Sequence, residues 1–477
     1  MKIRLKELAE VIGGEVRQGK PGLMLNGVST DSRAVSRGNV FFALKGERFD
    51  GHQFVKDVEK KGAFAAVVRR DFSCKLSRDF GLVSVSDPLY ALGELARFKR
   101  AGMKAKVIGI TGSVGKTTTK EMVSLVLSEK FKTVKSEGNF NNLIGVPLTI
   151  LKIPVDTEVA VLELASNQRG EIARLSEIAQ PDIGVITRIS EAHLMGLKDL
   201  DGVEREKRAL MGALGTGGIF VFNSGDPRLC RLAMGFAGRK AGFGLRGERL
   251  RGAEITVVAG KIKGGIQGQK FLVRVLGKKE ERSLVEICGL GEHLVEDALC
   301  AIAVGRILGV SLKQSGERLK CFKPMPGRGS LENIWKGVWL LDESYNANPE
   351  SMRQALKVFS EYSRMISGKK ILVLGEMLEL GESGAKSHQE LGEFLQDIPF
   401  DELFYTGSFE KELALGLGKY AGKKLRMCKS LEQIEEALKL EFCEGLEQGL
   451  ILLKGSHGIG LWNLARALRE RSWFRRS

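Results

Sequence analysis

The chain has 477 residues and a formal net charge of +16. This length is enough for about two to four domains. A hydrophobic content of 43% with 28% charged residues is typical of a globular protein and excludes a disordered chain. No apolar run approaches the length of a membrane-spanning helix, and the first residues lack the apolar core of a signal peptide. We therefore expect a cytoplasmic protein without membrane insertion.

The positive charge is spread along the chain, apart from the basic C-terminal residues 466–477. Such a surface suits a small polyanionic substrate as well as it suits nucleic acid. We rank an anionic ligand first and expect no nucleic-acid partner. The seven cysteines are scattered and form no close pair, so the sequence suggests neither a zinc site nor a disulfide framework.

Residues 1–102 are predicted to form a first α/β domain, which ends in a linker at Ala101-Gly102. The apolar pattern predicts helices and buried strands in this order: helix 5–12, strand 39–44, helix 54–61, strand 64–68, strand 82–85 and helix 88–100. A polar cluster at Ser29–Arg33 (STDSR) precedes the first of these strands. It is either a simple turn or a binding site for a diphosphate or a sugar.

A strand, a glycine turn and a helix follow one another at Lys106–Leu127 (KVIGITGSVGKTTTKEMVSLVL), near the start of a second predicted domain, 103–325. Glycines let backbone N–H groups crowd around phosphate oxygens, and the helix N-terminus adds its positive dipole end. Lys116 is expected to reach the β- and γ-phosphates, and Thr117 to bind Mg²⁺. The usual first glycine is replaced by Ile110. The flanking strand and helix and the three threonines nevertheless favour nucleotide binding over a chance match.

The rest of the second domain alternates strands and helices, which is typical of a doubly wound parallel sheet. The predicted elements are strands 159–164 and 182–187, helices 202–214 and 292–308, and a glycine- and valine-rich β segment at 250–290. Glu163 and Ile189–Gly196 (ISEAHLMG) come at the carboxyl ends of the two strands. Open α/β sheets bind ligands at this edge.

A third α/β domain is predicted at 326–477, where a linker, Pro324–Gly329 (PMPGRG), joins it to the second domain. Its strands are predicted at 337–342, 370–375, 403–406 and 450–454. Helices between them indicate a second parallel sheet, of Rossmann type. The predicted fold class is therefore α/β with three domains, of which the central one is a P-loop doubly wound sheet.

Several segments together resemble the ATP-dependent Mur ligases. They are GITGSVGKTTTKEM, GNFNNLIGVPLTIL, VLELASNQRGEI, ISEAHLMG, DESYNANPESM and VLGEMLELGESGAKSHQELG, with STDSR and GNVFFALKGERFDGHQF in the first domain. The similarity covers nearly the whole chain. DESYNANPESM followed by LGEMLELG is its most specific part, and resembles the members that add D-alanyl-D-alanine instead of a single amino acid.

The resemblance implies an amide-bond ligase of peptidoglycan precursor synthesis that uses ATP and Mg²⁺. The terminal carboxylate of UDP-MurNAc-tripeptide attacks the γ-phosphate, and the amine of D-alanyl-D-alanine then attacks the acyl phosphate. Both partners of the first step are anions. Two unit charges about 4 Å apart repel by about 4 kcal/mol at an effective dielectric near ~20. Lys116 and metal ions are the natural means of cancelling this repulsion.

The resemblance assigns Thr117 and Glu163 to one Mg²⁺ site and His193 to a second. It matches Lys207 with a lysine that is carbamylated and then binds metal. Each residue also has a plainer alternative: Glu163 is a surface carboxylate, His193 a structural histidine, and Lys207 a solvated helix lysine. The implied catalytic residues are Lys116, His193, Lys207 and Arg328.

The phosphate loop and the resemblance together give a set of ATP-binding residues. They are Gly109, Thr111, Gly112, Ser113, Val114, Gly115, Lys116, Thr117, Thr118, Asn142, His293, Arg328, Asp342, Tyr345 and Asn346. Asn142 either holds a substrate oxygen or caps a turn. Arg328 is a solvated linker residue or reaches the γ-phosphate on domain closure, and Asp342 is expected to accept hydrogen bonds from the ribose.

In the first domain the resemblance implies UDP contacts. The residues are Ser29, Thr30, Asp31, Ser32, Arg33 and Lys45. Two other functions stay open on the sequence: another Mur ligase or a folylpolyglutamate synthase-like ligase, and a nucleotide-regulated module that binds nucleic acid. We expect the protein to act as a monomer, with hinges near 102 and 325 that let the domains close over the substrates.

Overall fold

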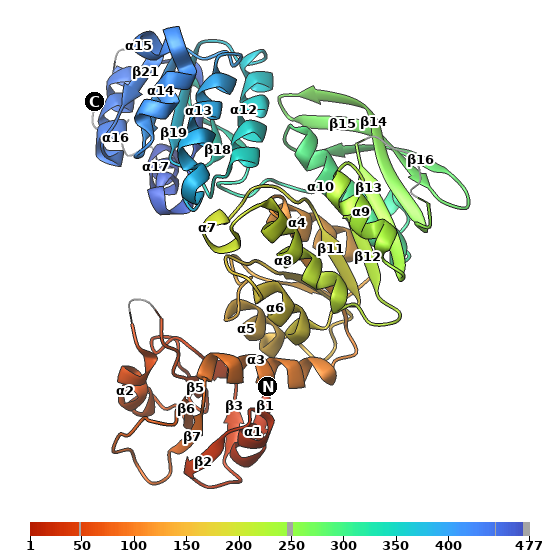
Figure 1. Cartoon of the computed structure of the whole chain (residues 1–477), viewed down its shortest axis with the longest axis vertical. Coiled ribbons are helices and arrows are strands. Elements are labelled where there is room, and N and C mark those ends of the chain that lie inside the picture. The colour runs from red at the N-terminus through yellow and green to blue at the C-terminus, as the bar shows by residue number, and fades with distance from the viewer. Residues whose placement is uncertain (47–48, 246–250, 444, 471–477) are drawn as a thin grey trace.

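The computed structural model describes residues 1–46, 49–245, 251–443 and 445–470, with three α/β domains along the chain (Figure 1). The first domain has a five-stranded sheet in the order β2-β7-β6-β5-β4, parallel except for β2. Its strands are β2 (Glu15–Gln18), β4 (Val28–Ser29), β5 (Val40–Phe42), β6 (Ala65–Arg69) and β7 (Gly81–Val85), with the small pair β1 (Lys2–Arg4) and β3 (Met24–Asn26) beside them. Its helices are α1 (Leu5–Val11), η1 (Gly51–Phe54), α2 (Val55–Lys60) and α3 (Pro88–Ala101).

The central domain is built on a nine-stranded sheet in the order β16-β15-β14-β13-β12-β11-β8-β10-β9. Seven strands are parallel: β8 (Lys106–Thr111), β9 (Thr133–Lys135), β10 (Val159–Glu163), β11 (Ile183–Ile186), β12 (Ile219–Asn223), β13 (Arg239–Gly244) and β14 (Ile255–Gly265). The predicted β segment supplies β14 and the antiparallel edge strands β15 (Gly268–Leu276) and β16 (Glu281–Ile287), which lie at one side of the molecule (Figure 1).

Helices cover both faces of this sheet, so the predicted doubly wound fold is confirmed. In β8, Val107 packs into one core and Ile108 into the other, because alternate side chains of a strand point to opposite faces. One face carries α4 (Lys116–Leu127), α10 (Glu292–Ile307) and α11 (Leu312–Leu319). The other carries α5 (Gly145–Lys152), α6 (Glu171–Ala179), α8 (Leu200–Gly212) and α9 (Pro227–Gly235), and the short α7 (Leu194–Leu197) precedes α8.

The C-terminal domain has a six-stranded sheet in the order β17-β18-β22-β19-β20-β21. Its strands are β17 (Ser330–Trp335), β18 (Gly337–Glu343), β19 (Lys369–Gly375), β20 (Glu402–Thr406), β21 (Leu425–Met427) and β22 (Gln448–Lys454), with β17 antiparallel. The helices are α12 (Pro349–Ser363), η2 (Gly381–Ser383), α13 (Gly384–Leu395), α14 (Glu410–Leu417), η3 (Gly418–Tyr420), α15 (Ala421–Lys424), α16 (Leu431–Cys443), η4 (His457–Ile459) and α17 (Leu461–Arg469). The four strands predicted here are present. The edge strands β17 and β21 were missed, because edge strands carry a weak apolar pattern.

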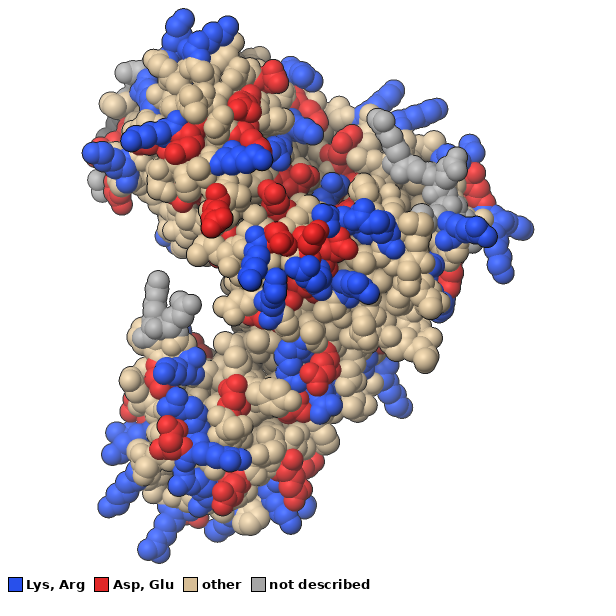
Figure 2. Space-filling model, in the orientation of Figure 1, with Lys and Arg blue, Asp and Glu red and all other residues tan. Residues whose placement is uncertain are grey.

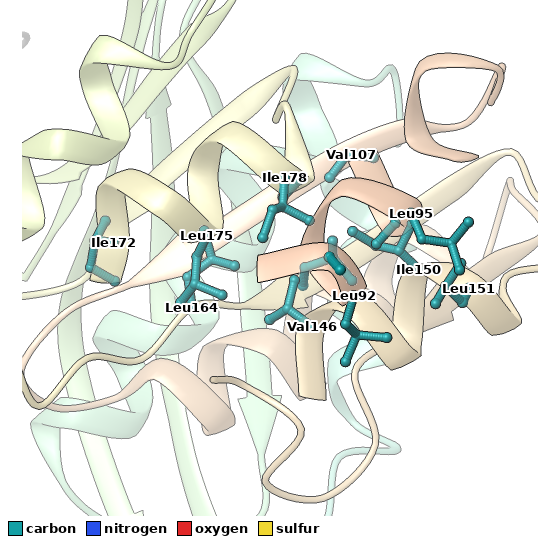
Figure 3. Close-up of a cluster of buried hydrophobic side chains, with 14 of the residues drawn as sticks. Leu92, Leu95, Val107, Val146, Ile150, Leu151, Leu164, Ile172, Leu175 and Ile178 are labelled. Atoms are coloured by element: carbon teal, nitrogen blue, oxygen red, sulfur yellow. The ribbon is translucent and has the colours of Figure 1, made fainter. Parts of the chain in front are cut away.

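Helix α3 joins the first domain to the central one through a continuous apolar core. Leu92 and Leu95 of α3 pack among side chains of α5 and α6 (Figure 3). The buried guanidinium of Arg100 donates to the carbonyls of Ala179 and Gln180, both at 2.9 Å. The helix therefore belongs to the cores of both domains.

The three domains leave a wide notch on one side of the molecule. Figure 2 shows it between the first domain, below, and the C-terminal domain, above, with the central domain as its floor. No described helix is long and apolar enough to span a bilayer.

Candidate active site

The phosphate loop, residues 112–115, lies between β8 and α4 and depends on its glycines. Gly112 has φ +150° and Gly115 has φ +82°. A Cβ atom on Gly112 would lie 2.0 Å from Thr187 Oγ1, so no side chain fits there. Lys116 Nζ donates to the carbonyl of Gly112 at 2.7 Å, which holds the ammonium group against the loop. Burial lowers the pKa of Lys116.

Glu163, at the end of β10, is a buried carboxylate next to this loop. Its Oε1 accepts hydrogen bonds from Thr117 Oγ1 at 3.1 Å and from Asn141 Nδ2 at 2.9 Å. Its Oε2 is buried and accepts none, with the ammonium nitrogen of Lys120 3.7 Å away. A hydroxyl and a carboxylate with a spare buried oxygen form a donor set that fits Mg²⁺.

The two asparagines of the loop before α5 have different roles. Asn142 Oδ1 accepts from the backbone N–H of Ile144 and of Gly145, so Asn142 caps the turn, the plainer of its two predicted roles. Asn141 instead holds Glu163 and lines the cavity described below. Nothing in the sequence separates the two neighbours.

Lys207 projects from α8 into the interior, so the alternative of a solvated helix lysine is wrong. Its side chain is 1% exposed, and Nζ donates to Ser166 Oγ at 2.9 Å. Burial, assisted by the nearby charge of Lys116, lowers the pKa of Lys207 to about 7. A large share of this amine is therefore neutral near pH 7, and only a neutral amine reacts with CO₂.

His193 lies at the start of α7 and contacts the C-terminal domain. Its Nδ1 is 2.5 Å from Oε2 of Glu379, and Met195 N donates to the carbonyl of Glu379 at 3.2 Å. This hydrogen bond lowers the pKa of Glu379. Among the described residues, no three His, Cys, Asp or Glu side chains form a group that could hold a metal ion. Any metal bound near His193 therefore needs other ligands too.

The cavity between the central and C-terminal domains brings the phosphate loop together with residues of the third domain. Arg328 stacks its guanidinium 3.9 Å from the ring centre of Tyr345. Lys454 is buried and donates to the carbonyl of Asn346 at 3.0 Å, and burial lowers the pKa of Lys454. Of the predicted site residues, those lining the cavity are Ser113, Val114, Gly115, Lys116, Thr117, Thr118, Glu163, His193, His293, Arg328, Tyr345 and Asn346.

Sequence reasoning missed several polar residues of the same cavity. They include Asn167, Thr187, Arg188, Asn223, Glu296, Asp297, Glu343 and Gln354. Arg188 forms an ion pair with Glu296 at 2.6 Å and a longer one, 3.7 Å, with Glu350 of the C-terminal domain. Burial raises the pKa of Asp297 well above its ordinary value. The position of Arg188 just after β11 was a signal that could have identified it.

Some predicted ATP-binding residues lie behind the cavity wall. Gly109 sits inside β8, where a Cβ atom would come within 3.2 Å of Leu164, and Thr111 is buried at the strand end. Gly112 and Asn142 are also absent from the lining. Asp342 is 1% exposed, and its two oxygens accept from Gly327 N, Ser344 N, Ser344 Oγ and Arg469 Nη2. The ribose contact predicted for Asp342 has no support in this arrangement.

In the first domain the cluster Ser29–Arg33 forms a self-contained turn. Asp31 Oδ2 pairs with Arg33 Nη2 at 2.8 Å, and this guanidinium lowers the pKa of Asp31 to about 2. Ser29 Oγ donates to the carbonyl of Asp31. Lys45 is exposed and forms a β-bridge with Asp50. Thr30 and Ser32 are partly exposed in the same turn. The turn alternative therefore describes the structure, and the UDP contact stays a prediction.

The fold and the cavity define a class: a three-domain P-loop protein whose nucleotide site is shared by the central and C-terminal domains. Family models match all three domains: the Mur ligase family catalytic domain at residues 25–100, the Mur ligase middle domain at 110–305 and the Mur ligase glutamate ligase domain at 328–457. The chain belongs to the Mur ligase family.

Several relatives about 30% identical to the chain over most of its length carry the same name. The UDP-N-acetylmuramoyl-tripeptide–D-alanyl-D-alanine ligases of Bacillus subtilis and of Escherichia coli are each 32% identical to the chain, over 98% of it and 99% of their own length. A crystal structure of MurF from Acinetobacter baumannii matches with a TM-score of 0.87 at 30% identity, covering 98% of this chain and 99% of that one. MurF ligase from Thermotoga maritima, in complex with ADP, matches with a TM-score of 0.80 at 27% identity, covering 95% and 99%.

Proposed function

We propose that the chain joins the terminal carboxylate of UDP-MurNAc-tripeptide to the amino group of D-alanyl-D-alanine, with conversion of ATP to ADP and phosphate. The relatives named for this reaction align with nearly the whole chain. The observation that carries the proposal is the cavity shared by two domains. Lys116 of the phosphate loop and Arg328 of the third domain both line it. Cations from two domains thereby surround the place where two anions must meet.

In the first step the substrate carboxylate oxygen attacks the γ-phosphorus, and the bond to the β–γ bridging oxygen breaks, releasing ADP. Lys116 and Arg328 offset the repulsion between the two anions. Thr117 and Glu163 would hold a Mg²⁺ ion, which supplies further positive charge at the phosphates. In the second step the neutral amine attacks the acyl carbon, phosphate leaves, and the amine gives up a proton.

Lys207 is proposed to act as a carbamate, as the resemblance implies. Its low pKa, its burial and its hydroxyl partner Ser166 supply the neutral amine that carbamylation requires. The product is an anion at a position where the ammonium form would repel a metal ion. With His193 it would provide ligands for a second Mg²⁺ ion.

The first domain is proposed to hold the UDP end of the substrate through Ser29, Thr30, Asp31, Ser32, Arg33 and Lys45. A substrate held by both this domain and the C-terminal domain would cross the notch that Figure 2 shows between them. ATP and UDP-linked precursors are cytoplasmic metabolites, so we propose a cytoplasmic enzyme. We propose that the chain acts as a monomer.

The test is phosphate release by the purified chain with ATP and Mg²⁺, across a panel of UDP-MurNAc-peptides and amino acceptors. Release is expected only when a UDP-MurNAc-tripeptide and D-alanyl-D-alanine are both present. Release with single amino acids instead would identify another ligase of the family. RNA binding that weakens with salt, with no release from any pair, would favour the nucleic-acid module.

The Lys207→Ala variant tests the carbamate in the same assay. Its activity is expected to fall by at least about 100-fold, since a metal ligand is lost, and to recover in part with short carboxylic acids. Full activity of the variant without added acid contradicts the assignment.

A further inference from the structure

The contact between His193 and Glu379 joins two domains at one hydrogen bond. His193 belongs to the central domain and Glu379 to the loop after β19 in the C-terminal domain, 186 residues along the chain. Both the side chain and the backbone carbonyl of Glu379 contact this segment, since Met195 N also donates to that carbonyl. The contact therefore holds both the carboxylate and the backbone of Glu379 against this segment.

Both residues also hold backbone conformations that cost energy. His193 has φ +53° and Glu379 has φ +64°, a region that non-glycine residues rarely occupy. Only six such non-glycine residues occur in the described part of the chain, and two of them meet here. Strain of this kind persists where surrounding contacts enforce it, and it is concentrated at functional sites.

The loop of Glu379 is anchored to the nucleotide side of the C-terminal domain. Leu378 N donates to Ser456 Oγ at 2.8 Å, and Ser456 Oγ donates to the carbonyl of Ala347, a residue of the cavity wall. Met377 N donates to Nε2 of His388 at 3.1 Å. The position of Glu379 relative to His193 therefore depends on where the C-terminal domain lies.

The chemistry of the hydrogen bond decides which ring nitrogen of His193 is free. A carboxylate only accepts, so the proton of the neutral imidazole must lie on Nδ1. Nε2 then carries the lone pair, and among the described side chains and backbone groups it has no hydrogen-bond partner. The ring lies in the cavity wall, where a lone pair can bind a metal ion.

We propose that Glu379 is a positioning residue for His193: from the C-terminal domain it fixes the Nδ1–H tautomer and the ring orientation, so that Nε2 is presented to the cavity when the two domains are docked. The inference rests on the proposed function for the role of His193 as a metal ligand. When the C-terminal domain docks, His193 of the central domain is therefore held in the tautomer and orientation that a metal ligand needs. A carboxylate behind a metal-binding histidine has this effect in other metal sites, where its loss costs about 10–100-fold in metal affinity.

The tautomer can be measured on the metal-free protein by nitrogen-15 NMR of the histidine rings. The chain has only five histidines, and His193→Asn identifies the signal of interest. His52 and His388 serve as internal references, because Nε2 of each accepts a backbone N–H and their proton must lie on Nδ1. The wild-type His193 signal is expected to match them. Glu379→Gln, which keeps an acceptor oxygen, should preserve the Nδ1–H form, whereas Glu379→Ala should shift it towards Nε2–H.

The second measurement is the Mg²⁺ concentration that gives half-maximal phosphate release. Glu379→Ala is expected to raise it about 10-fold or more and Glu379→Gln by far less, while KM for the UDP-tripeptide stays within about twofold. Glu382→Ala is the matched control, because this carboxylate three residues on is exposed and the described structure shows no hydrogen bond or ion pair between it and His193, so it should change neither readout.

The outcomes distinguish the positioning role of Glu379 from the proposed function of the protein. An unchanged His193 tautomer in Glu379→Ala, with ligase activity intact, overturns the positioning role. An unchanged Mg²⁺ requirement with a shifted tautomer overturns the link to the metal. A shifted tautomer in a protein that shows no ligase activity with any substrate pair overturns the proposed function and leaves the positioning of His193 standing.

Discussion

At the scale of single residues, the buried charges of the central domain are the most informative feature. Lys120 and Glu163 are both buried, and neither Lys120 Nζ nor Glu163 Oε2 has a hydrogen bond. A buried charge without a partner is costly. Lys120 Nζ lies 3.7 Å from Glu163 Oε2 and 3.4 Å from Glu121 Oε1, so the buried ammonium group is paired with two carboxylates. Lys120 therefore supplies a positive charge beside Glu163, the carboxylate that we propose binds Mg²⁺.

We expect Lys120→Met to lower the free energy of unfolding by about 3 kcal/mol in EDTA, because buried Glu163 then loses the cation 3.7 Å from its Oε2. Urea unfolding measures the change. The double variant Lys120→Met/Glu163→Gln should recover part of it, since the second substitution removes the charge of Glu163. Wild-type stability of the single variant in EDTA would show that the pair contributes nothing.

At the scale of elements, His388 links α13 to the loop that follows β19. Its Nε2 accepts from Met377 N, its Nδ1 donates to the carbonyl of Gly384 at 2.8 Å, and its ring stacks on Phe409. Burial lowers the pKa of His388 below its ordinary 6.5. Protonation would place a hydrogen on Nε2 and break the bond to Met377.

This arrangement predicts a pH dependence of stability. The pKa of His388 is lower in the folded state than in the unfolded chain. At pH values between these two pKa values the unfolded chain therefore binds more protons than the folded protein. The stabilisation is complete above about pH 6.5 and is lost as the pH falls. Urea unfolding at pH 7.5 and pH 5.5 is expected to show a smaller loss for His388→Gln, which still accepts from Met377 N but does not titrate. Equal losses in the two proteins would contradict the prediction.

At the scale of the whole molecule, the two interdomain joints differ in kind. Helix α3 is packed from both sides, with Arg174 of α6 stacked 4.0 Å from the ring of Tyr90 and paired with Glu94 at 2.8 Å. A rotation near residue 102 would break this buried joint. The joint to the C-terminal domain includes Leu290, which packs into the C-terminal core, and the polar contacts of Arg188 and His193. We expect these polar contacts to open at less cost than the core around α3.

Hydrogen exchange with and without Mg²⁺-ADP tests this difference. Nucleotide is expected to increase protection in the linker 323–329 and in the loop 376–383, which belong to the joint with the C-terminal domain. The amides of α3 should keep the same exchange rates, because their packing does not change. An equal change in α3 would show that the first domain moves as well, as the hinge predicted near residue 102 requires.

The sequence by itself determined the local architecture. Apolar runs predicted β8, β10 and β11 of the central sheet and four strands of the C-terminal sheet, and the glycines before Lys116 predicted the phosphate loop, because backbone geometry and periodicity are properties of neighbouring residues. The central strands β12 and β13 were not predicted. The short edge strands and the choice between Asn141 and Asn142 had no such signal. The placement of Glu163 at the end of β10 followed from the strand alone.

Only the tertiary structure decided which distant side chains meet. Thr119 and Asp297 are 178 residues apart and share a hydrogen bond, and Glu379 reaches His193 across 186 residues. The same packing shielded Lys207 from water and enclosed Asp342, whose two oxygens accept hydrogen bonds from protein donors. Contact and burial depend on how whole elements pack, and the order of residues along one segment does not contain that information.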